Sequence, residues 1–202
     1  MPLLIASNNS GKIAEIRALF PELRVISPAD HGLDIQVAEE GRTFFENAYL
    51  KACAFATASD LVSMADDSGL EIDALGGAPG IHSARFGGKG LNDEDRCELV
   101  LGQLRDVSPA RRQARFRCCI VIVGPDGRLI SSQGTCQGRI SRHPRGDNGF
   151  GYDPVFYLSS HQKTMAELPS EEKNRISHRA AAIRLIGPGL LSAFPKLRED
   201  LP

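Results

Sequence analysis

Two adjacent acids, Asp66 and Asp67, interrupt an apolar stretch in the segment "SMADDSGLEIDAL". Burying a carboxylate is costly unless a cation or several hydrogen bonds meet it. The pair therefore predicts either a solvated turn between two strands or a site for a cation, and the local sequence favours neither. Neighbouring residues on a regular strand point to opposite faces, so we expect one acid to face a ligand and the other to cap a turn.

A second pair of acids, Glu39 and Glu40, precedes an expected helix start at Thr43 and could supply another carboxylate. Two or three carboxylate oxygens, completed by phosphate oxygens and water, are the usual way in which proteins hold Mg²⁺. The five histidines and five cysteines have no spacing typical of zinc ligands. The acids thus favour Mg²⁺ over zinc.

The segment "ASNNSGK" lies between an expected strand and an expected helix. Backbone N–H groups at such a helix start can bind an anion. Lys12 falls in the first turn, where its charge opposes the helix dipole unless an anion compensates it. The segment is no Walker A loop, because Ala6 replaces its first glycine and Ile13 its metal-binding hydroxyl. An anion-binding loop and a capped helix with a solvated lysine are both compatible with this segment.

Two further segments combine aromatic and basic residues. Phe150 stands between two glycines in "GDNGFGYDPVF", where its ring could stack on a nucleotide base or plug the core from a turn. "EEKNRISHR" gathers Lys173, His178 and Arg179, which one continuous helix would spread over different faces. They can meet one ligand only if the helix breaks and Ser177 caps a new one. Otherwise they form the polar face of an amphipathic helix.

Local patterns predict the elements that must position these residues. Thr43 and Asn92 are expected helix N-caps, and the glycines and proline of residues 124–127 predict a hairpin. The expected strands cover residues 2–6, 61–65, 70–75, 113–123, 128–137 and 152–158, and the expected helices cover residues 12–20, 43–59, 92–106, 170–186 and 190–197. Alternating strands and helices followed by a hairpin predict an α/β fold with a mixed sheet.

Composition limits the classes of function. The chain has 202 residues, 42% hydrophobic and 24% charged, as expected for one large globular domain or two small lobes. Its net charge of −1 gives no basic field that would favour nucleic acid, and no apolar run is long enough for a signal peptide or a membrane span. We therefore expect no nucleic-acid or membrane partner. The five cysteines form no CxxC pair and leave one unpaired, which indicates reduced thiols, so we expect a cytoplasmic protein.

Five motifs occur in a characteristic order: "SNNSGK", "EEGRTFFENAYLKA", "ADDSGLEIDALGGAPGIHSARF", "GFGYDPVF" and "ELPSEEKNRISHR". Together, over residues 3–191, they resemble the inosine triphosphate pyrophosphatase family of the RdgB type. The resemblance implies one domain over residues 1–202, an elongated α/β fold with a mixed central sheet and flanking helices, two lobes around an active-site cleft, and a homodimer. It implies Mg²⁺-dependent hydrolysis of the α–β phosphoanhydride of XTP, dITP and ITP to the monophosphate and pyrophosphate, which cleanses the nucleotide pool.

The resemblance also assigns roles to residues. Asp67 would activate water and bind Mg²⁺, and Glu39 would be the second metal carboxylate. The substrate-binding positions would be Ser7, Asn8, Asn9, Ser10, Gly11, Lys12 and Lys51 at the triphosphate, Ser68 beside it, Phe150, Gly151, Tyr152 and Asp153 at the nucleoside, and Lys173, His178 and Arg179 around the base and phosphates. Ser7, Asn8 and Glu40 replace a frequent Thr, Gly and Thr of the family, and the last change leaves Glu40 as an alternative to Glu39.

Two other functions fit part of this pattern. A non-catalytic nucleotide-binding module with the same loops would bind ITP but release no pyrophosphate. A Maf-like nucleotide pyrophosphatase would act mainly on other modified nucleotides. The "SHR" segment after "EEK" favours the inosine triphosphate pyrophosphatases over the Maf-like enzymes, by resemblance alone.

Overall fold

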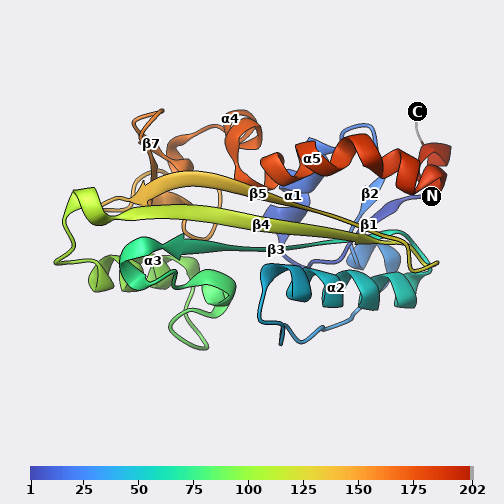
Figure 1. The fold of residues 1–202 in the computed structure, drawn as a ribbon, viewed down its shortest axis with the longest axis horizontal. Coiled ribbons are helices and arrows are strands. Elements are labelled where there is room, and N and C mark those ends of the chain that lie inside the picture. The colour runs from blue at the N-terminus through green and yellow to red at the C-terminus, as the bar shows by residue number, and fades with distance from the viewer. Residues whose placement is uncertain (201–202) are drawn as a thin grey trace. The chain divides into compact units, whose positions relative to one another are not determined.

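The computed structural model describes residues 1–200. Its strands are β1 (Leu3–Ile5), β2 (Val25–Ile26), β3 (Ser63–Ile72), β4 (Gln113–Val123), β5 (Leu129–Ile140), β6 (Phe156–Leu158) and β7 (Lys163–Thr164), and its α-helices are α1 (Ser10–Leu19), α2 (Phe44–Ser59), α3 (Asp93–Gln103), α4 (Ser170–Ile176) and α5 (His178–Ala193). The strands form one sheet in the order β2-β1-β3-β4-β5-β6-β7 (Figure 1). β1 is parallel to β2 and β3, whereas β6 is antiparallel to β5 and β7. The predicted α/β fold with a mixed sheet and flanking helices is confirmed.

The chain divides into two compact units. Unit 1 contains Met1–Asp67, Cys118–Gly134 and the chain from Arg179 onward, and unit 2 contains Ser68–Arg117 and Thr135–His178. The long strands β3, β4 and β5 therefore contribute residues to both units.

The core of unit 1 joins α1 and α5 to the strands. Its members include Ile16 of α1, Met64 of β3, Ile120 of β4 and Ile183 of α5, all at most 4% exposed. Within this unit, α5 and α2 lie on opposite sides of the strands (Figure 1). β1 and residues 118–123 of β4 are thus buried throughout, which explains their continuous apolar sequences, whereas β5 exposes alternate residues from Leu129 on.

Helix α2 begins as its sequence predicts. Thr43 is the N-cap, with extended backbone and a hydroxyl that accepts the Glu46 N–H at 3.1 Å. The buried residues of this helix recur at helical spacing and are Phe44, Asn47, Ala48, Ala52, Phe55 and Ala56. The cap therefore fixes the position of the polar residues Asn47 and Lys51, which lie four residues apart and share one face.

The core of unit 2 lies around the strands beyond the two acids. Leu70, Ile72, Phe116 and Phe156 are buried there together with one face of α3. Helix α3 begins with the predicted cap at Asn92, whose side chain accepts the Asp95 N–H. Asn92 and Asp95 form a reciprocal capping box, which orients the first turn of α3.

Several expected element boundaries were wrong. The strands expected at residues 61–65 and 70–75 are one strand, β3, which runs straight through Asp66 and Asp67 because their charges are met there by cations. The strand expected at residues 152–158 is confined to β6, since Asp153–Val155 form a 3₁₀ turn that contains a proline. The helix expected at residues 190–197 is instead the end of α5 followed by a 3₁₀ turn.

The helix expected at residues 170–186 breaks at Ser177, where the backbone is extended (φ −65°, ψ 157°). A new helix, α5, therefore begins at His178, so Lys173 lies on α4 whereas His178 and Arg179 lie on α5. Within the described residues, no helix is both long and apolar enough to cross a membrane.

Candidate active site

Asp66 is the centre of a buried ionic cluster in unit 1. Its side chain points toward α1 and α5, and the residue is only 1% exposed. Arg179 donates to Asp66 Oδ2 from Nη2 at 2.7 Å and from Nε at 3.2 Å, and the Lys12 Nζ lies 3.1 Å from Oδ1. Burial alone would raise the pKa of Asp66, but the charges of Arg179, Lys12 and Lys51 outweigh it and hold this pKa well below its usual range.

Arg179 is fixed by two carboxylates rather than one. Its Nη1 also contacts the Glu15 carboxylate of α1, and the residue is 1% exposed. Burial would lower the pKa of Arg179, but Asp66 and Glu15 raise it, so the guanidinium stays charged. The helix break at Ser177 makes this geometry possible, because it places Arg179 in the first turn of α5.

Asp67, the next residue on β3, meets α2 on the opposite side. Asn47 Nδ2 donates to Asp67 Oδ2 at 3.2 Å, and the Lys51 Nζ lies 3.5 Å from Oδ1. Asp67 is 5% exposed, and this burial raises its pKa even though Lys51 and Lys12 oppose the shift. A carboxylate of raised pKa is a better proton acceptor, which suits a general base.

Glu39 and Asp67 both contact the ammonium group of Lys51. The Lys51 Nζ donates to Glu39 Oε1 at 2.6 Å and to the Asp66 backbone carbonyl at 3.0 Å, whereas Glu40 is exposed. Burial would lower the pKa of Lys51, but Asp67 and Glu39 raise it. The two carboxylates therefore converge on a place that already accommodates positive charge. Hard oxygen donors of this kind fit Mg²⁺.

The described residues hold no group of three or more His, Cys, Asp or Glu side chains that could bind a metal ion alone. A metal held by Glu39 and Asp67 would therefore take its other ligands from phosphate and water, as Mg²⁺ usually does. Gly41 supports this arrangement, because its N–H donates to Asn47 Oδ1 at 2.8 Å and a Cβ at this position would lie 2.7 Å from that oxygen. Only glycine lets the acidic segment approach α2 so closely.

The loop before α1 has the geometry of an anion-binding helix start. Asn9 is the N-cap, and its Oδ1 accepts the Lys12 N–H at 2.9 Å. Ser7 Oγ accepts the Asn9 N–H at 3.2 Å, while Asn8, Asn9 and Ser10 are exposed. Exposed backbone and a nearby ammonium group are the features that bind phosphate at a helix N-terminus.

In unit 2, a glycine-rich loop presents Phe150. Gly149 has φ +79°, and a Cβ there would lie 2.1 Å from Asp153 Oδ2. That carboxylate accepts the Phe150 N–H at 2.9 Å and forms a buried ion pair with Lys173. The Lys173 Nζ also lies 4.6 Å from the centroid of the Phe150 ring. Asp153 thus holds both the loop backbone and the cation beside the ring.

Helix α3 holds the next peptide of this loop. The Gly151 N–H donates to Asp93 Oδ2 at 2.7 Å, and the Cys97 Sγ lies 3.4 Å from the Gly151 carbonyl. A hollow of about 590 Å³ is lined by these residues and by Phe150. Burial raises the pKa of the Cys97 thiol to about 12, so the cysteine acts here as a packed thiol.

Tyr152 and His178 are less accessible than the sequence suggests. The Tyr152 ring is buried, and its hydroxyl donates to the Ser83 carbonyl at 2.9 Å. His178 stacks on Phe116 with ring centroids 4.8 Å apart and an interplanar angle of 17°. Both residues therefore support the loop and the core of unit 2 through these contacts.

The expected site residues thus form two sets. Unit 1 brings together Glu39, Lys51 and Asp67 on one face of β3, with Lys12 and Arg179 on the other. Unit 2 brings together Phe150, Asp153 and Lys173, and it contains Ser68 within β3.

Sequence reasoning missed four side chains that hold these sets in place: Glu15, Asn47, Asp66 as the partner of Arg179, and Asp93. Asn47 could have been found, since it lies one helical turn before Lys51 on α2. Glu15 likewise lies one turn after Lys12 on α1, which places both on one face.

Comparison with known proteins defines the class. The model of the Ham1 family matches residues 3–188, so the chain belongs to that family. A relative from Shouchella clausii named "dITP/XTP pyrophosphatase" is 43% identical over 195 residues, with 96% of this chain and 98% of the relative covered. A relative of the same name from Halalkalibacterium halodurans is 46% identical, with 90% and 94% covered.

A solved structure agrees with the sequence relatives. The Ham1 protein of Staphylococcus aureus superposes with a TM-score of 0.84 at 44% identity, with 95% of this chain and 99% of that chain covered. The family expected from the five motifs is confirmed.

Proposed function

We propose that this protein is a Mg²⁺-dependent nucleoside triphosphate pyrophosphatase that hydrolyses XTP, dITP and ITP at the α–β phosphoanhydride, releasing the monophosphate and pyrophosphate. The observation that carries the proposal is the buried carboxylate of Asp67, set between Asn47 and Lys51 and beside Glu39. The names of the relatives from Shouchella clausii and Halalkalibacterium halodurans support dITP and XTP among these substrates. The biological role would be removal of deaminated purine nucleotides from the nucleotide pool.

In this proposal Asp67 accepts the proton of the attacking water. Its raised pKa favours proton transfer, and Asn47 fixes the orientation of the carboxylate by its hydrogen bond at 3.2 Å. Glu39 and Asp67 would hold Mg²⁺. Bound there, Mg²⁺ would lower the pKa of a bound water and offset the charge of the phosphates.

The phosphate tail would meet the loop of residues 7–12 and the cations around it. Lys12 and Lys51 are both placed by carboxylates, at 3.1 Å from Asp66 and 2.6 Å from Glu39 respectively. We assign Arg179 to the phosphates rather than to the base, because Asp66 and Glu15 hold its guanidinium beside Lys12. Three cations of this kind suit a tetra-anionic triphosphate.

The nucleoside would meet the loop that carries Phe150. Base stacking on an aromatic ring is tolerant of sequence, so the ring would supply affinity and not selectivity. Selectivity would come from donors that read the 6-oxo group of hypoxanthine and xanthine. Lys173, with its Nζ 4.6 Å from the Phe150 ring, is the candidate beside the loop, and His178, which stacks on Phe116, is a candidate by resemblance. Adenine presents an amino donor at that position, and sites built for a specific hydrogen bond reject such a mismatch by roughly 10⁴–10⁵-fold.

A pyrophosphate-release assay on purified protein tests this function. We expect dITP and XTP to be hydrolysed well above dGTP, with dATP and the pyrimidine triphosphates lowest, and we expect EDTA to stop and Mg²⁺ to restore the reaction. Glu39→Gln should raise the Mg²⁺ concentration needed for activity more than Glu40→Gln does. Similar kcat/KM for dITP and dATP would contradict the proposed base pocket.

The assay also separates the two alternative functions. A nucleotide-binding module would bind ITP in a titration without releasing pyrophosphate, and a Maf-like enzyme would prefer other modified nucleotides. We further propose a homodimer, by resemblance, which sedimentation analysis would test. None of the five cysteines, all of which the structure describes, forms a disulfide, in keeping with the proposed reducing cytoplasm.

A further inference from the structure

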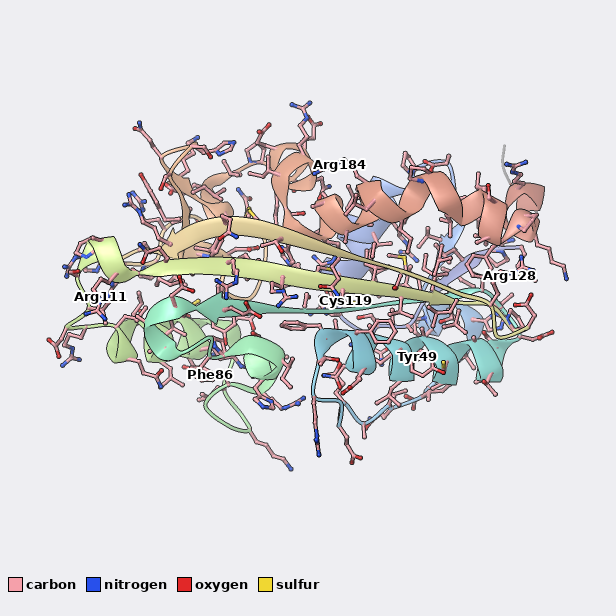
Figure 2. All side chains as sticks on the ribbon, viewed as in Figure 1. Tyr49, Phe86, Arg111, Cys119, Arg128 and Arg184 are labelled. Carbon is pink, nitrogen blue, oxygen red and sulfur yellow. The ribbon has the colours of Figure 1, made fainter. Side chains whose placement is uncertain are left out.

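A second concentration of positive charge lies in unit 2, on residues with no role in the proposed reaction. A hollow of about 320 Å³ has a lining that includes Arg112, Arg139, Arg142, His143, Arg145 and Tyr157. We call this hollow the basic pocket. Its size is in the range of small-molecule sites. Arg111, which precedes Arg112 in the sequence, lies at the end of the 3₁₀ turn that leads into β4 and is not part of the lining (Figure 2).

The buried side of the basic pocket is the guanidinium of Arg112, whose hydrogen-bond partners among the described residues are backbone carbonyls. Arg112 is 3% exposed, and it donates from Nη2 to the Leu104 carbonyl at 2.7 Å, from Nε to the Val107 carbonyl at 3.2 Å, and from Nη1 to the Ser141 carbonyl. The Ser141 N–H in turn donates to the Val155 carbonyl at 2.9 Å. These hydrogen bonds fix the positions of the Arg112 side chain and the Ser141 backbone. This side of the pocket is therefore preformed.

The remaining cations have little negative charge to meet. Among the described residues, Arg139 and Arg142 form no ion pair, and Arg145 pairs with Glu167, whose Oε2 lies 3.6 Å away and also accepts the Thr164 N–H at 2.7 Å. Arg145 also lines the hollow beside Phe150, which contains the acids Asp93, Glu94, Glu98 and Asp147. Burial and the neighbouring charge of Arg142 lower the pKa of Arg112. The four arginines of the basic pocket thus form one ion pair among the described residues, that of Arg145 with Glu167, although the whole chain has a net charge of −1.

Tyr157 organises two of these cations. The guanidinium carbons of Arg139 and Arg145 lie 4.7 and 5.3 Å from its ring centroid. Such contacts hold the side chains in place without neutralising them. Tyr157 thus holds both guanidinium groups at the pocket.

We propose that the basic pocket binds a small phosphate compound that carries at least two negative charges, of the size of inorganic pyrophosphate. Guanidinium groups match phosphate oxygens with paired N–H donors, and a concave site with several of them suits a compact polyanion. No residue of the pocket belongs to the loop of residues 7–12 or to the carboxylate site, so this ligand site does not depend on the proposed activity.

Calorimetric titration with sodium pyrophosphate at constant ionic strength tests the proposal. The titration is made in the Lys12→Ala background, which weakens the proposed substrate phosphate site. We expect binding of one pyrophosphate, and we expect Arg139→Gln with Arg142→Gln to weaken it by about tenfold or more, the usual effect of losing charged hydrogen bonds. The matched control is Lys89→Gln with Arg105→Gln, which removes two exposed positive charges elsewhere in unit 2 and should leave the affinity unchanged.

Equal weakening in the pocket variant and the control variant would overturn the proposal, as would absence of pyrophosphate binding in the Lys12→Ala background. Thermal melting of each variant shows that the fold is intact. Titrations with inorganic phosphate and with a single-stranded oligonucleotide complete the test. Weaker binding of phosphate than of pyrophosphate supports the proposal, and binding of the oligonucleotide alone would overturn it.

Discussion

The carboxylate site of unit 1 and the Phe150 loop of unit 2 are built in different ways. In unit 1 the charged residues stand on regular elements, and the pleat of β3 sends Asp66 and Asp67 to opposite sides. In unit 2 the Phe150 loop contains glycines of positive φ, and the carboxylates of Asp153 and Asp93 accept its Phe150 and Gly151 N–H groups. We therefore expect changes in unit 1 to affect the chemical step or the stability of the fold, and changes in unit 2 to affect substrate binding.

The largest expected effect comes from Asp67→Asn. Asparagine keeps the shape of the side chain but accepts no proton, so kcat for dITP should fall by about 10²–10⁴-fold, the usual contribution of a positioned base. Pyrophosphate release at saturating dITP measures the effect. Asp34→Asn, at an exposed position, is the control and should retain full activity. If kcat of Asp67→Asn stays near the wild-type value, Asp67 is not the base.

The next effect concerns stability. Arg179→Met leaves the buried Asp66 carboxylate with Lys12 as its remaining charged partner, and removal of one partner from a buried pair costs about 3–5 kcal/mol of unfolding free energy. Urea denaturation measures this loss. Adding Asp66→Asn to Arg179→Met should recover part of it, because the second change removes the uncompensated charge. Additive losses in the double variant would show that the pair does not couple the two residues.

The sequence predicted some of the features behind these two predictions and not others. The α/β class, the caps at Thr43 and Asn92 and the hairpin follow from local signals, because each depends on residues a few positions apart. The continuity of β3 through Asp66 and Asp67 does not, since the compensating charge of Arg179 comes from 113 residues further along the chain. Local patterns could show that two acids were costly, but not which cations would meet them.

In unit 2, Gly149→Ala should raise KM for dITP more than Gly151→Ala does. Both glycines have positive φ, so each substitution strains the backbone by roughly 1–2 kcal/mol. Only at position 149 would the new Cβ meet Asp153, at 2.1 Å, whereas nothing lies within 4 Å of a Cβ at position 151. Steady-state kinetics should show a KM raised about tenfold or more for Gly149→Ala with kcat nearly unchanged. Equal effects at the two positions would show that backbone strain alone matters.

The smallest expected effect is that of Asp93→Ala. It tests whether α3 positions the Phe150 loop without contacting the substrate. The Asp93 carboxylate accepts the Gly151 N–H at 2.7 Å but is not among the residues assigned to substrate. A hydrogen bond of this kind contributes about 1 kcal/mol, so KM for dITP should rise by about three- to tenfold with little change in kcat. Asp106→Ala, at another exposed position of unit 2 outside this hollow, removes an equal charge and is the matched control. Asp93→Asn should recover part of the loss, since its amide oxygen can still accept the N–H. A fall in kcat with unchanged KM would instead place Asp93 in the chemical step. Unit 2 would then contribute to the reaction itself, and not only to binding of the nucleobase.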